Sequence, residues 1–340
     1  TSTPSATSVN QTISVPLGIK TALVTSLLAT SPINQDPPIR LTCAGGLTMV
    51  PLEDNSKMPS APEDTRIELI ARENATIQVN DYAEGMSATG SLLRYELLHD
   101  RSDLFGSPAT LLLNDMKTLA THLWIERDGG KGGAIGKGFA TSTTPKDTAT
   151  LRWANGVDFF FEENTKDSAL EKVICNKATL EDNDSIISCN SLTINFDASL
   201  TGSPTPTTAF ASGDVKAISD TQTLWSDTAE VLFKKLPSTK LQDGVTSGGS
   251  KAETMLAKGN VQILLGDGGR IFCHNVHANI PNDTATLSGN VLIAQNQMLI
   301  NKGETTKVTL DRNSGKGKWH GPGQALFLNV PFDMKPDKRI

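Results

Sequence analysis

The chain has 340 residues and a formal net charge of −6, with a sequence pI of about 5.4. This balance argues against a broad basic face for nucleic acid or for anionic lipid headgroups. Aromatic residues make up only 5% of the chain, and Gly, Ser, Thr, Asn and Asp are plentiful, which favours many short strands and turns over helix bundles.

Apolar and polar residues alternate in strand-like runs along most of the chain. Turn signals such as "HDRSD", "PNDT" and "DRNSGKG" separate these runs. A period of two makes one face of a strand apolar, so we expect an all-β protein of two facing antiparallel sheets. In chain order, the sets that share a face are Leu93, Tyr95 and Leu97; Ala109, Leu111 and Leu113; Leu119, Thr121, Leu123 and Ile125; Leu151 and Trp153; Val157, Phe159 and Phe161; Leu192, Ile194 and Phe196; Ala229, Val231 and Phe233; Val261, Ile263 and Leu265; Val291 and Ile293; Val308 and Leu310.

A short repeat organises the second half of the chain. Gly followed by Asp or Asn and then Val occurs at residues 213–215, 259–261 and 289–291. We expect the glycine to stand before each strand, where a side chain would obstruct a tight or bulged turn. Each copy then adds one rung to a stacked sheet. The intervals of 46 and 30 residues are too uneven for a strict solenoid, and residues 236–251 are expected to be an inserted mobile loop.

The stretches "ASGDVKA", "LWSDTAEVLF", "AKGNVQI" and "SGNVLIAQ" together resemble the OstA-like, or LptA-type, family of lipopolysaccharide-transport proteins. The resemblance runs from about residue 213 to 327 and, more weakly through "LRYELLHDRSDLFGSPATLLL", from about 41 to 161. It implies a β-taco, or β-jellyroll, in which two antiparallel sheets fold into a V around an apolar groove. It also implies a periplasmic protein that binds lipopolysaccharide or a related lipid.

The chain is about twice as long as a simple member of that family, so two tandem units or one elongated unit fit. We expect an N-terminal extension at residues 1–38 and β units at 39–161 and 162–332. The sequence begins with Thr1, which leaves open a membrane anchor in a segment before it. The groove is expected to be lined by Val215, Ala217, Val231, Phe233, Val261, Ile263, Val291, Ile293, Val308 and Leu310.

The sequence leaves two classes of function open. The first is a lipid-binding or lipid-conduit protein that holds acyl chains in the groove. The second is a structural or adhesion-like β-stack that binds protein partners by strand addition. In either class, the runs at 39–50 and 323–332 are expected to form open edges that pair end to end with other transport components or with a second copy.

No motif in the chain indicates an enzyme, a cofactor or a metal site. In "CHNVH" at residues 273–277, the two histidines are three apart, and a regular strand would turn them to opposite faces. The glycine-rich run at 128–138 lacks the spacing of a phosphate loop and is expected to be a flexible hairpin. Glu162 and Glu163 fit a solvated strand end. Cys175 and Cys189 are either bridged or, more simply, small buried apolar residues.

Overall fold

The computed structural model describes residues 40–43, 47–52, 66–71, 77–81, 86–96, 100–113, 116–126, 129–143, 148–161, 170–182, 185–197, 205–235, 239–240, 246–247, 250–266, 268–295, 298–302, 305–311 and 316–327. Over these residues the protein is all β, as expected, with antiparallel pairing throughout and no closure into a barrel. The chain divides into two units, residues 1–168 and 169–340. The boundary expected after residue 161 is a few residues before this division. The expected extension at 1–38 and the pair Glu162 and Glu163 lie outside the described residues.

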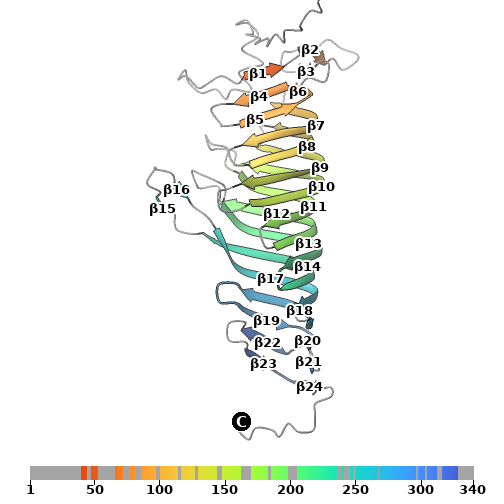
Figure 1. Ribbon diagram of the computed structural model, residues 1–340, viewed down its shortest axis with the longest axis vertical. Coiled ribbons are helices and arrows are strands. Elements are labelled where there is room, and N and C mark those ends of the chain that lie inside the picture. The colour runs from red at the N-terminus through yellow and green to blue at the C-terminus, as the bar shows by residue number, and fades with distance from the viewer. Residues whose placement is uncertain are drawn as a thin grey trace, which may run out of the picture. The chain divides into compact units, whose positions relative to one another are not determined.

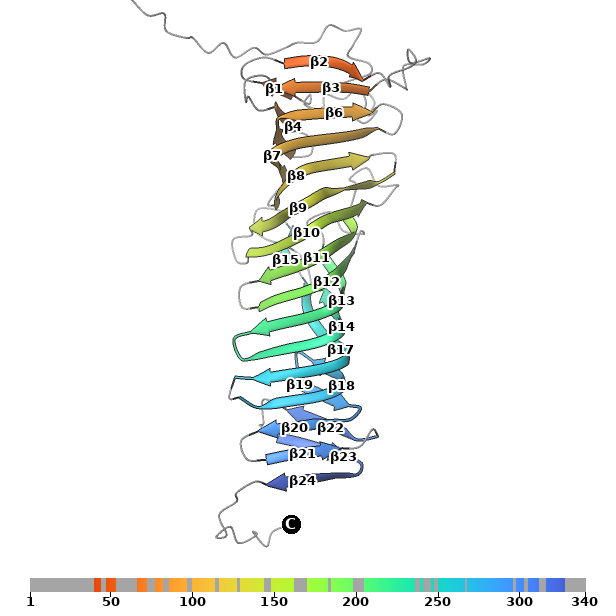
Figure 2. The ribbon, with the colours of Figure 1, turned by 90° about the vertical axis from the view of Figure 1, so that its right-hand side faces the viewer.

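Unit 1 is a stack of bent rungs (Figures 1 and 2). Its strands are β1 (Arg40–Cys43), β2 (Leu47–Leu52), β3 (Arg66–Ala71), β4 (Ile77–Asp81), β5 (Met86–Gly90), β6 (Leu92–Glu96), β7 (Arg101–Leu113), β8 (Met116–Glu126), β9 (Lys131–Thr143) and β10 (Thr148–Phe161).

The long strand β7 shows how the two arms of unit 1 arise. Its first half pairs with β6, and its second half pairs with β5, with a break in register between Phe105 and Ala109. Arm 1A therefore contains β1, β4, β5 and the halves of β7 to β10 formed by 109–113, 116–120, 138–143 and 148–153. Arm 1B contains β2, β3, β6 and the halves formed by 101–105, 122–126, 131–135 and 156–160.

Unit 2 has the same construction. Its strands are β11 (Leu170–Asp182), β12 (Ser185–Asp197), β13 (Thr205–Ser219), β14 (Gln222–Lys235), β17 (Ser250–Leu265), β18 (Arg270–Asn279), β19 (Thr284–Ser288), β20 (Leu292–Gln295), β21 (Met298–Lys302), β22 (Lys307–Asp311), β23 (Lys316–His320) and β24 (Gly323–Phe327). β18 demonstrates the bend, because its first part pairs with β20 and its second part with β19.

The arms of unit 2 follow from these pairings. Arm 2A contains β19, β22, β23 and the strand halves 170–176, 191–197, 205–212, 228–235, 250–258 and 275–279. Arm 2B contains β20, β21, β24 and the halves 178–182, 185–189, 215–219, 222–226, 261–265 and 270–273. We call the line where the rungs bend the corner, and the apolar space inside it the crease.

The insertion between β14 and β17 lies mostly outside the described residues. Within it, β15 (Thr239–Lys240) pairs with β16 (Thr246–Ser247). In the described part of the chain, no helix is long and apolar enough to cross a membrane.

Candidate functional site: the apolar creases

The Gly-Asp and Gly-Asn repeats lie at the corner of unit 2, in the middle of rungs. Gly213 and Gly259 lie within β13 and β17, which corrects the expectation that they precede strands, whereas Gly289 stands between β19 and β20, as expected. Gly213, Gly259 and Gly289 have φ of +72°, +75° and +74°, and the Asp or Asn after each has φ between 46° and 50°. Two successive left-handed residues turn the rung from one arm into the other. Glycine meets the first requirement without strain, and Asn and Asp tolerate the second best among other residues.

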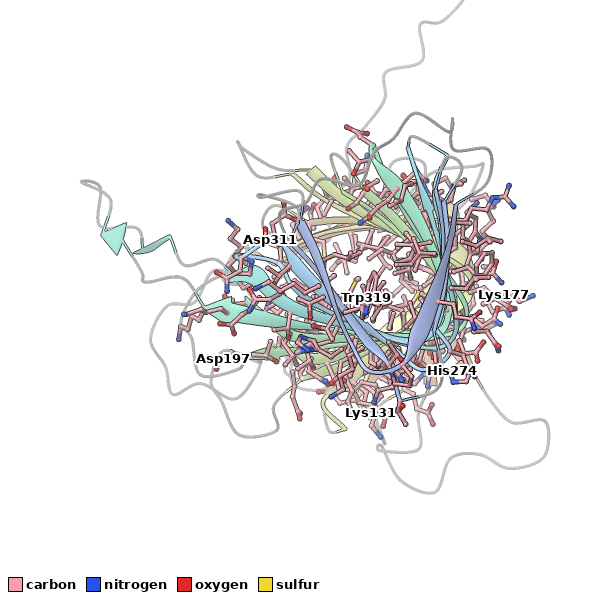
Figure 3. The ribbon with its side chains drawn as sticks, turned by 90° about the horizontal axis from the view of Figure 1, so that it is seen from below. Lys131, Lys177, Asp197, His274, Asp311 and Trp319 are labelled. Atoms are coloured by element: carbon pink, nitrogen blue, oxygen red, sulfur yellow. The ribbon has the colours of Figure 1, made fainter. Side chains whose placement is uncertain are left out.

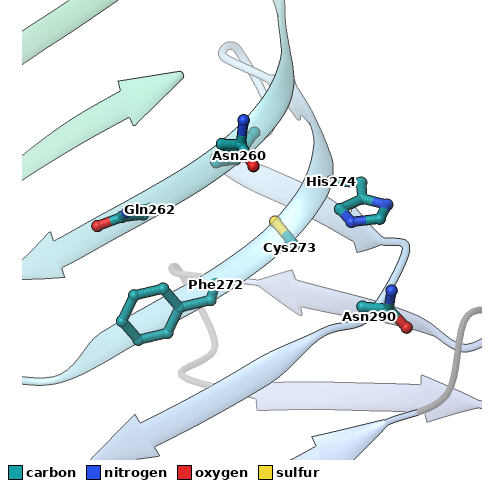
Figure 4. A pocket seen from close by; sticks show the side chains of 7 residues that line it. Asn260, Gln262, Phe272, Cys273, His274 and Asn290 are labelled. Carbon is teal, nitrogen blue, oxygen red and sulfur yellow. The ribbon is translucent and has the colours of Figure 1, made fainter. Parts of the chain in front are cut away.

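At each of these corners, a residue on the neighbouring rung takes part in a hydrogen bond. The amide nitrogen of Asn190 donates to Asp214 at 3.0 Å, and that of Asn260 donates to Asp227 at 3.0 Å. The backbone nitrogen of His274 donates to the carbonyl of Gly289 at 2.8 Å. Figure 4 shows Asn260, His274 and Asn290 at the corner, around an open hollow that Gln262 and Phe272 also line.

The rungs between the repeats bend differently, and this shifts the alternation by one residue. On β18, Cys273 and Val276 are both buried although they are three apart, and His274 and His277 are both exposed. The expectation that the two histidines face opposite ways is therefore wrong, because the corner adds a residue between them. Even so, the described residues contain no group of three or more side chains that could hold a metal ion.

The ten predicted groove residues all lie on the inner side of unit 2, and none is exposed. Five of them belong to one apolar cluster at the crease: Val261, Ile263, Val291, Ile293 and Val308. Ala217 and Leu310 are half-buried and pack against this cluster. Val215 is buried on β13, and Val231 and Phe233 are half-buried on the 2A half of β14.

The sequence interpretation missed several members of the same cluster. Leu224, Ala257, Ile271, Cys273, Val276 and Leu287 are buried there as well. Their alternation was hidden by the corners: in "IFCHNVHANI" the inward positions run Ile271, Cys273 and then Val276. A search for alternation that permits one break per strand finds them.

On several rungs of unit 2, burial falls with distance from the corner. On β17, Val261 is 1% exposed and Ile263 9%, and Leu265 is half-buried. On β13, Val215 is buried and Ala217 half-buried, and on β22 Val308 is buried and Leu310 half-buried. The arms therefore pack closely at the crease and diverge away from it. In the view from the C-terminal end, Trp319 lies between the arms, while Lys177, Asp197, His274 and Asp311 lie outside (Figure 3).

Unit 1 has a crease of its own, which the predicted groove residues did not include. On arm 1A it is lined by Ala109, Thr118, Ala120, Ala140 and Trp153, and on arm 1B by Leu104, Leu123, Ala134 and Val157. Exposure again rises outward: Leu123 is buried and Ile125 is 38% exposed. The alternating runs around Leu123, Trp153 and Val157 in the sequence already carried this signal.

The glycine-rich run includes the turn of the β8–β9 hairpin, as expected, but most of it is strand and forms part of the wall of that crease. Gly132 to Gly138 lie within β9, and Gly129 and Gly130 belong to the turn before it. A Cβ on Gly138 would lie 2.7 Å from Cζ2 of Trp153, and one on Gly133 would lie 3.1 Å from Nε1 of Trp124. The glycines thus leave room for a tryptophan on each face of the strand, Trp153 inside and Trp124 outside.

The outer face of arm 1B carries a network of charges and rings. Arg101 donates two hydrogen bonds of 3.0 Å to Asp103, and Nε2 of His122 lies 2.6 Å from Oδ1 of Asp103. The ring of His122 stacks on Phe105, and the guanidinium of Arg101 covers Trp124. Burial by itself raises the pKa of Asp103, but the hydrogen bonds from Arg101 and His122 outweigh it and lower the pKa below its usual value.

No disulfide joins Cys175 to Cys189, so the bridge that the sequence left open is not formed. Cys175 pairs across the ladder with Leu192, and Cys189 with Ala178, so the two thiols are offset along the strands. Both are buried as small apolar residues. Burial raises the pKa of Cys189, and it raises the pKa of Cys273 to about 11.

In comparisons with known proteins, neither a protein-family model nor a curated protein matches this chain.

Proposed function

We propose that the chain is a lipid-binding or lipid-conduit protein that holds acyl chains in its creases, in the manner of lipopolysaccharide-transport components. The observation that carries this proposal is the burial gradient on β13, β17 and β22, where apolar residues continue outward from the corner and become more accessible. An ordinary sandwich core would instead be buried across its width, with polar residues at its rim.

The energetics favour such a ligand. Burying acyl chains yields about 0.8 kcal/mol per CH₂, so roughly a dozen carbons give on the order of 10 kcal/mol before the cost of ordering the ligand. A crease that is open along its length admits a chain from the side, whereas a closed barrel would require threading. The identity of the lipid as lipopolysaccharide, and the periplasmic location, rest on the resemblance of the Gly-Asn-Val rungs to the OstA-like family.

The four tryptophans provide an internal test of this proposal. Trp153 is buried inside unit 1, and Trp319, which pairs with the inward Val308, faces the inside of unit 2. Trp124 lies against Arg101 on the outside, and Trp225 has Lys216 against its ring. Four single-tryptophan variants should therefore respond differently to a brominated acyl chain. We expect quenching of Trp153 and Trp319 and little quenching of Trp124 and Trp225; equal quenching of all four would refute the crease as the binding site.

The competing function, partner binding by strand addition, has an observation of its own. Among the described residues, β24 pairs with β21 alone and β23 with β22 alone, so both form the edge of unit 2. Trp319 on β23 and Leu326 on β24 are 52% and 55% exposed. Light scattering over a concentration series, with the whole chain and with chains lacking 1–38 or 328–340, tests this. Assembly that persists without any lipid binding would favour this second function.

A further inference from the structure

Two buried polar atoms in the crease of unit 1 have no hydrogen-bond partner within the described part of the chain. They are Oγ1 of Thr118 and the indole Nε1 of Trp153, and the residues are 1% and 2% exposed. Buried polar groups in native proteins are almost always paired, so each unpaired one calls for a physical reason. A ligand that supplies the missing partner is one such reason.

The two atoms belong to the same stretch of the inner face of arm 1A. Trp153 on β10 pairs with Gly138 on β9, which pairs in turn with Ala120 on β8. Thr118 lies two residues from Ala120 on β8, and therefore on the same face. A Cβ on Gly138 would lie 2.9 Å from Cε2 of Trp153, the carbon bonded to Nε1. The edge of the indole that carries the N–H thus covers Gly138.

On the same rungs, the buried side chains of the facing arm 1B carry no acceptor. They are Leu104, Leu123, Ala134 and Val157, all apolar. Toward the mouth on arm 1A, Leu111, Met116 and Leu151 are half-buried. They lie farther from the corner than Trp153, and Met116 also lies farther from it than Thr118, so a chain that enters from the mouth meets them before the indole.

We propose that the crease of unit 1 binds an amphiphile whose acyl chain carries an ester or amide carbonyl, with the carbonyl oxygen accepting from the Trp153 indole and the Thr118 hydroxyl. An indole N–H only donates, so the ligand group has to be an acceptor. A free carboxylate is disfavoured at this depth, because an ion among apolar side chains without a counter-ion is costly to desolvate. This inference rests on the proposed function and specifies the ligand chemistry of one crease.

The test compares two probes of equal length, a long-chain fatty acid methyl ester and an n-alkane, in competition with a fluorescent hydrocarbon. Trp153→Phe and Thr118→Val approximate the shape of each side chain and remove its polar group. We expect each substitution to weaken binding of the ester about fivefold and the double variant correspondingly more, with binding of the alkane unchanged. Trp124→Phe and Thr110→Val, on the outer face, are the matched controls and should leave both affinities unchanged.

The stability of the Trp153→Phe and Thr118→Val variants without ligand tests the same inference. Since each substitution removes an unpaired buried group, the unfolding midpoint in denaturant should stay the same or rise. A fall would mean that the groups are already paired within the free protein, which overturns the inference. Ester and alkane affinities that change equally in the variants would also overturn it, while leaving acyl binding intact. A wild-type protein that binds neither probe would overturn the proposed function and this inference together.

Discussion

The side-chain amide of Asn260 donates to the carboxylate of Asp227 across the corner of unit 2. A side chain at the neighbouring position, Gly259, would overlap with Asp227. The same pair occurs with its partners exchanged one repeat earlier, where Asn190 donates to Asp214. At these two corners one amide faces one carboxylate, and either rung supplies either group.

Exchanging the pair should therefore preserve stability. Asn260→Asp alone places two carboxylates against each other and should lower the free energy of unfolding by about 1 kcal/mol. Adding Asp227→Asn should restore most of that loss, because the exchanged pair then matches Asn190 and Asp214. Denaturant unfolding of the four proteins in this cycle measures the coupling; additive effects of the two substitutions would contradict a direct interaction.

Position 259 requires glycine for two reasons, its positive φ and the lack of space for a side chain. A second glycine, to which only the first reason applies, separates the two effects. Gly259→Ala should be destabilised both by its φ of +75° and by overlap with Asp227. Gly268 has a φ of +87°, but a Cβ added there would meet no atom within 4 Å, so Gly268→Ala should cost only the roughly 1–2 kcal/mol of a left-handed alanine. Urea midpoints of the two variants should differ clearly, with Gly259→Ala the lower.

The Asp103 network should make unit 1 sensitive to acid. The pKa of Asp103 in the folded protein is lowered below its ordinary value of 3.8. Its contribution to stability is therefore fully present above the unfolded pKa and is lost as pH falls through the folded pKa. Asp103→Asn should cost about 1–3 kcal/mol near neutral pH, and the difference from wild type should shrink below about pH 4. Thermal unfolding between about pH 2 and pH 7 checks this; a constant difference would exclude the carboxylate's charge as the cause.

The thiol of Cys273 should resist alkylation in the folded protein. Its pKa is raised to about 11 by burial, so roughly one part in a thousand is thiolate at pH 8. Maleimide labelling followed by mass spectrometry should show no modification of Cys273 under native conditions and full modification in guanidinium. Rapid native labelling would indicate that the crease opens readily at this rung.

Photo-crosslinking can locate a ligand on one face of a single strand. Ile263 is buried at the crease and Gln262, its neighbour on β17, is exposed on the outside. A crosslinking residue at 263 should capture an acyl chain, and one at 262 should not, because adjacent residues of a strand face opposite ways. Equal capture from both positions would indicate nonspecific adhesion.

The fold class and the inward stripe could be predicted from the sequence because alternation is a direct consequence of strand geometry. Val261 and Ile263, or Val291 and Ile293, are two apart within one arm, and no corner intervenes between them. The corners, where the phase of alternation changes, could not be predicted in this way. This is why Cys273 and Val276 were overlooked and why His274 and His277 were assigned to opposite faces.

The crease of unit 1 was harder to recognise for a different reason. Its wall is built partly from small residues, Ala109, Ala120 and Gly138, which carry little weight in an apolar pattern. Their role emerges only from the position of Trp153 over Gly138. Likewise, Val231 and Phe233 alternate as regularly as Val261 and Ile263, but they lie farther from the corner and are less buried.

The bent rungs have a consequence for how the sequence of such a chain can change in evolution. The side-chain hydrogen bonds that match Asn190 to Asp214 and Asn260 to Asp227 lie at the corner, while the hairpins that join long rungs lie at the far ends of the arms. The segment between β14 and β17 adds residues at one of those hairpins, and these two strands still pair along most of their length. Duplication of whole hairpins can lengthen the stack, and insertions at its margins can vary, without disturbing the crease.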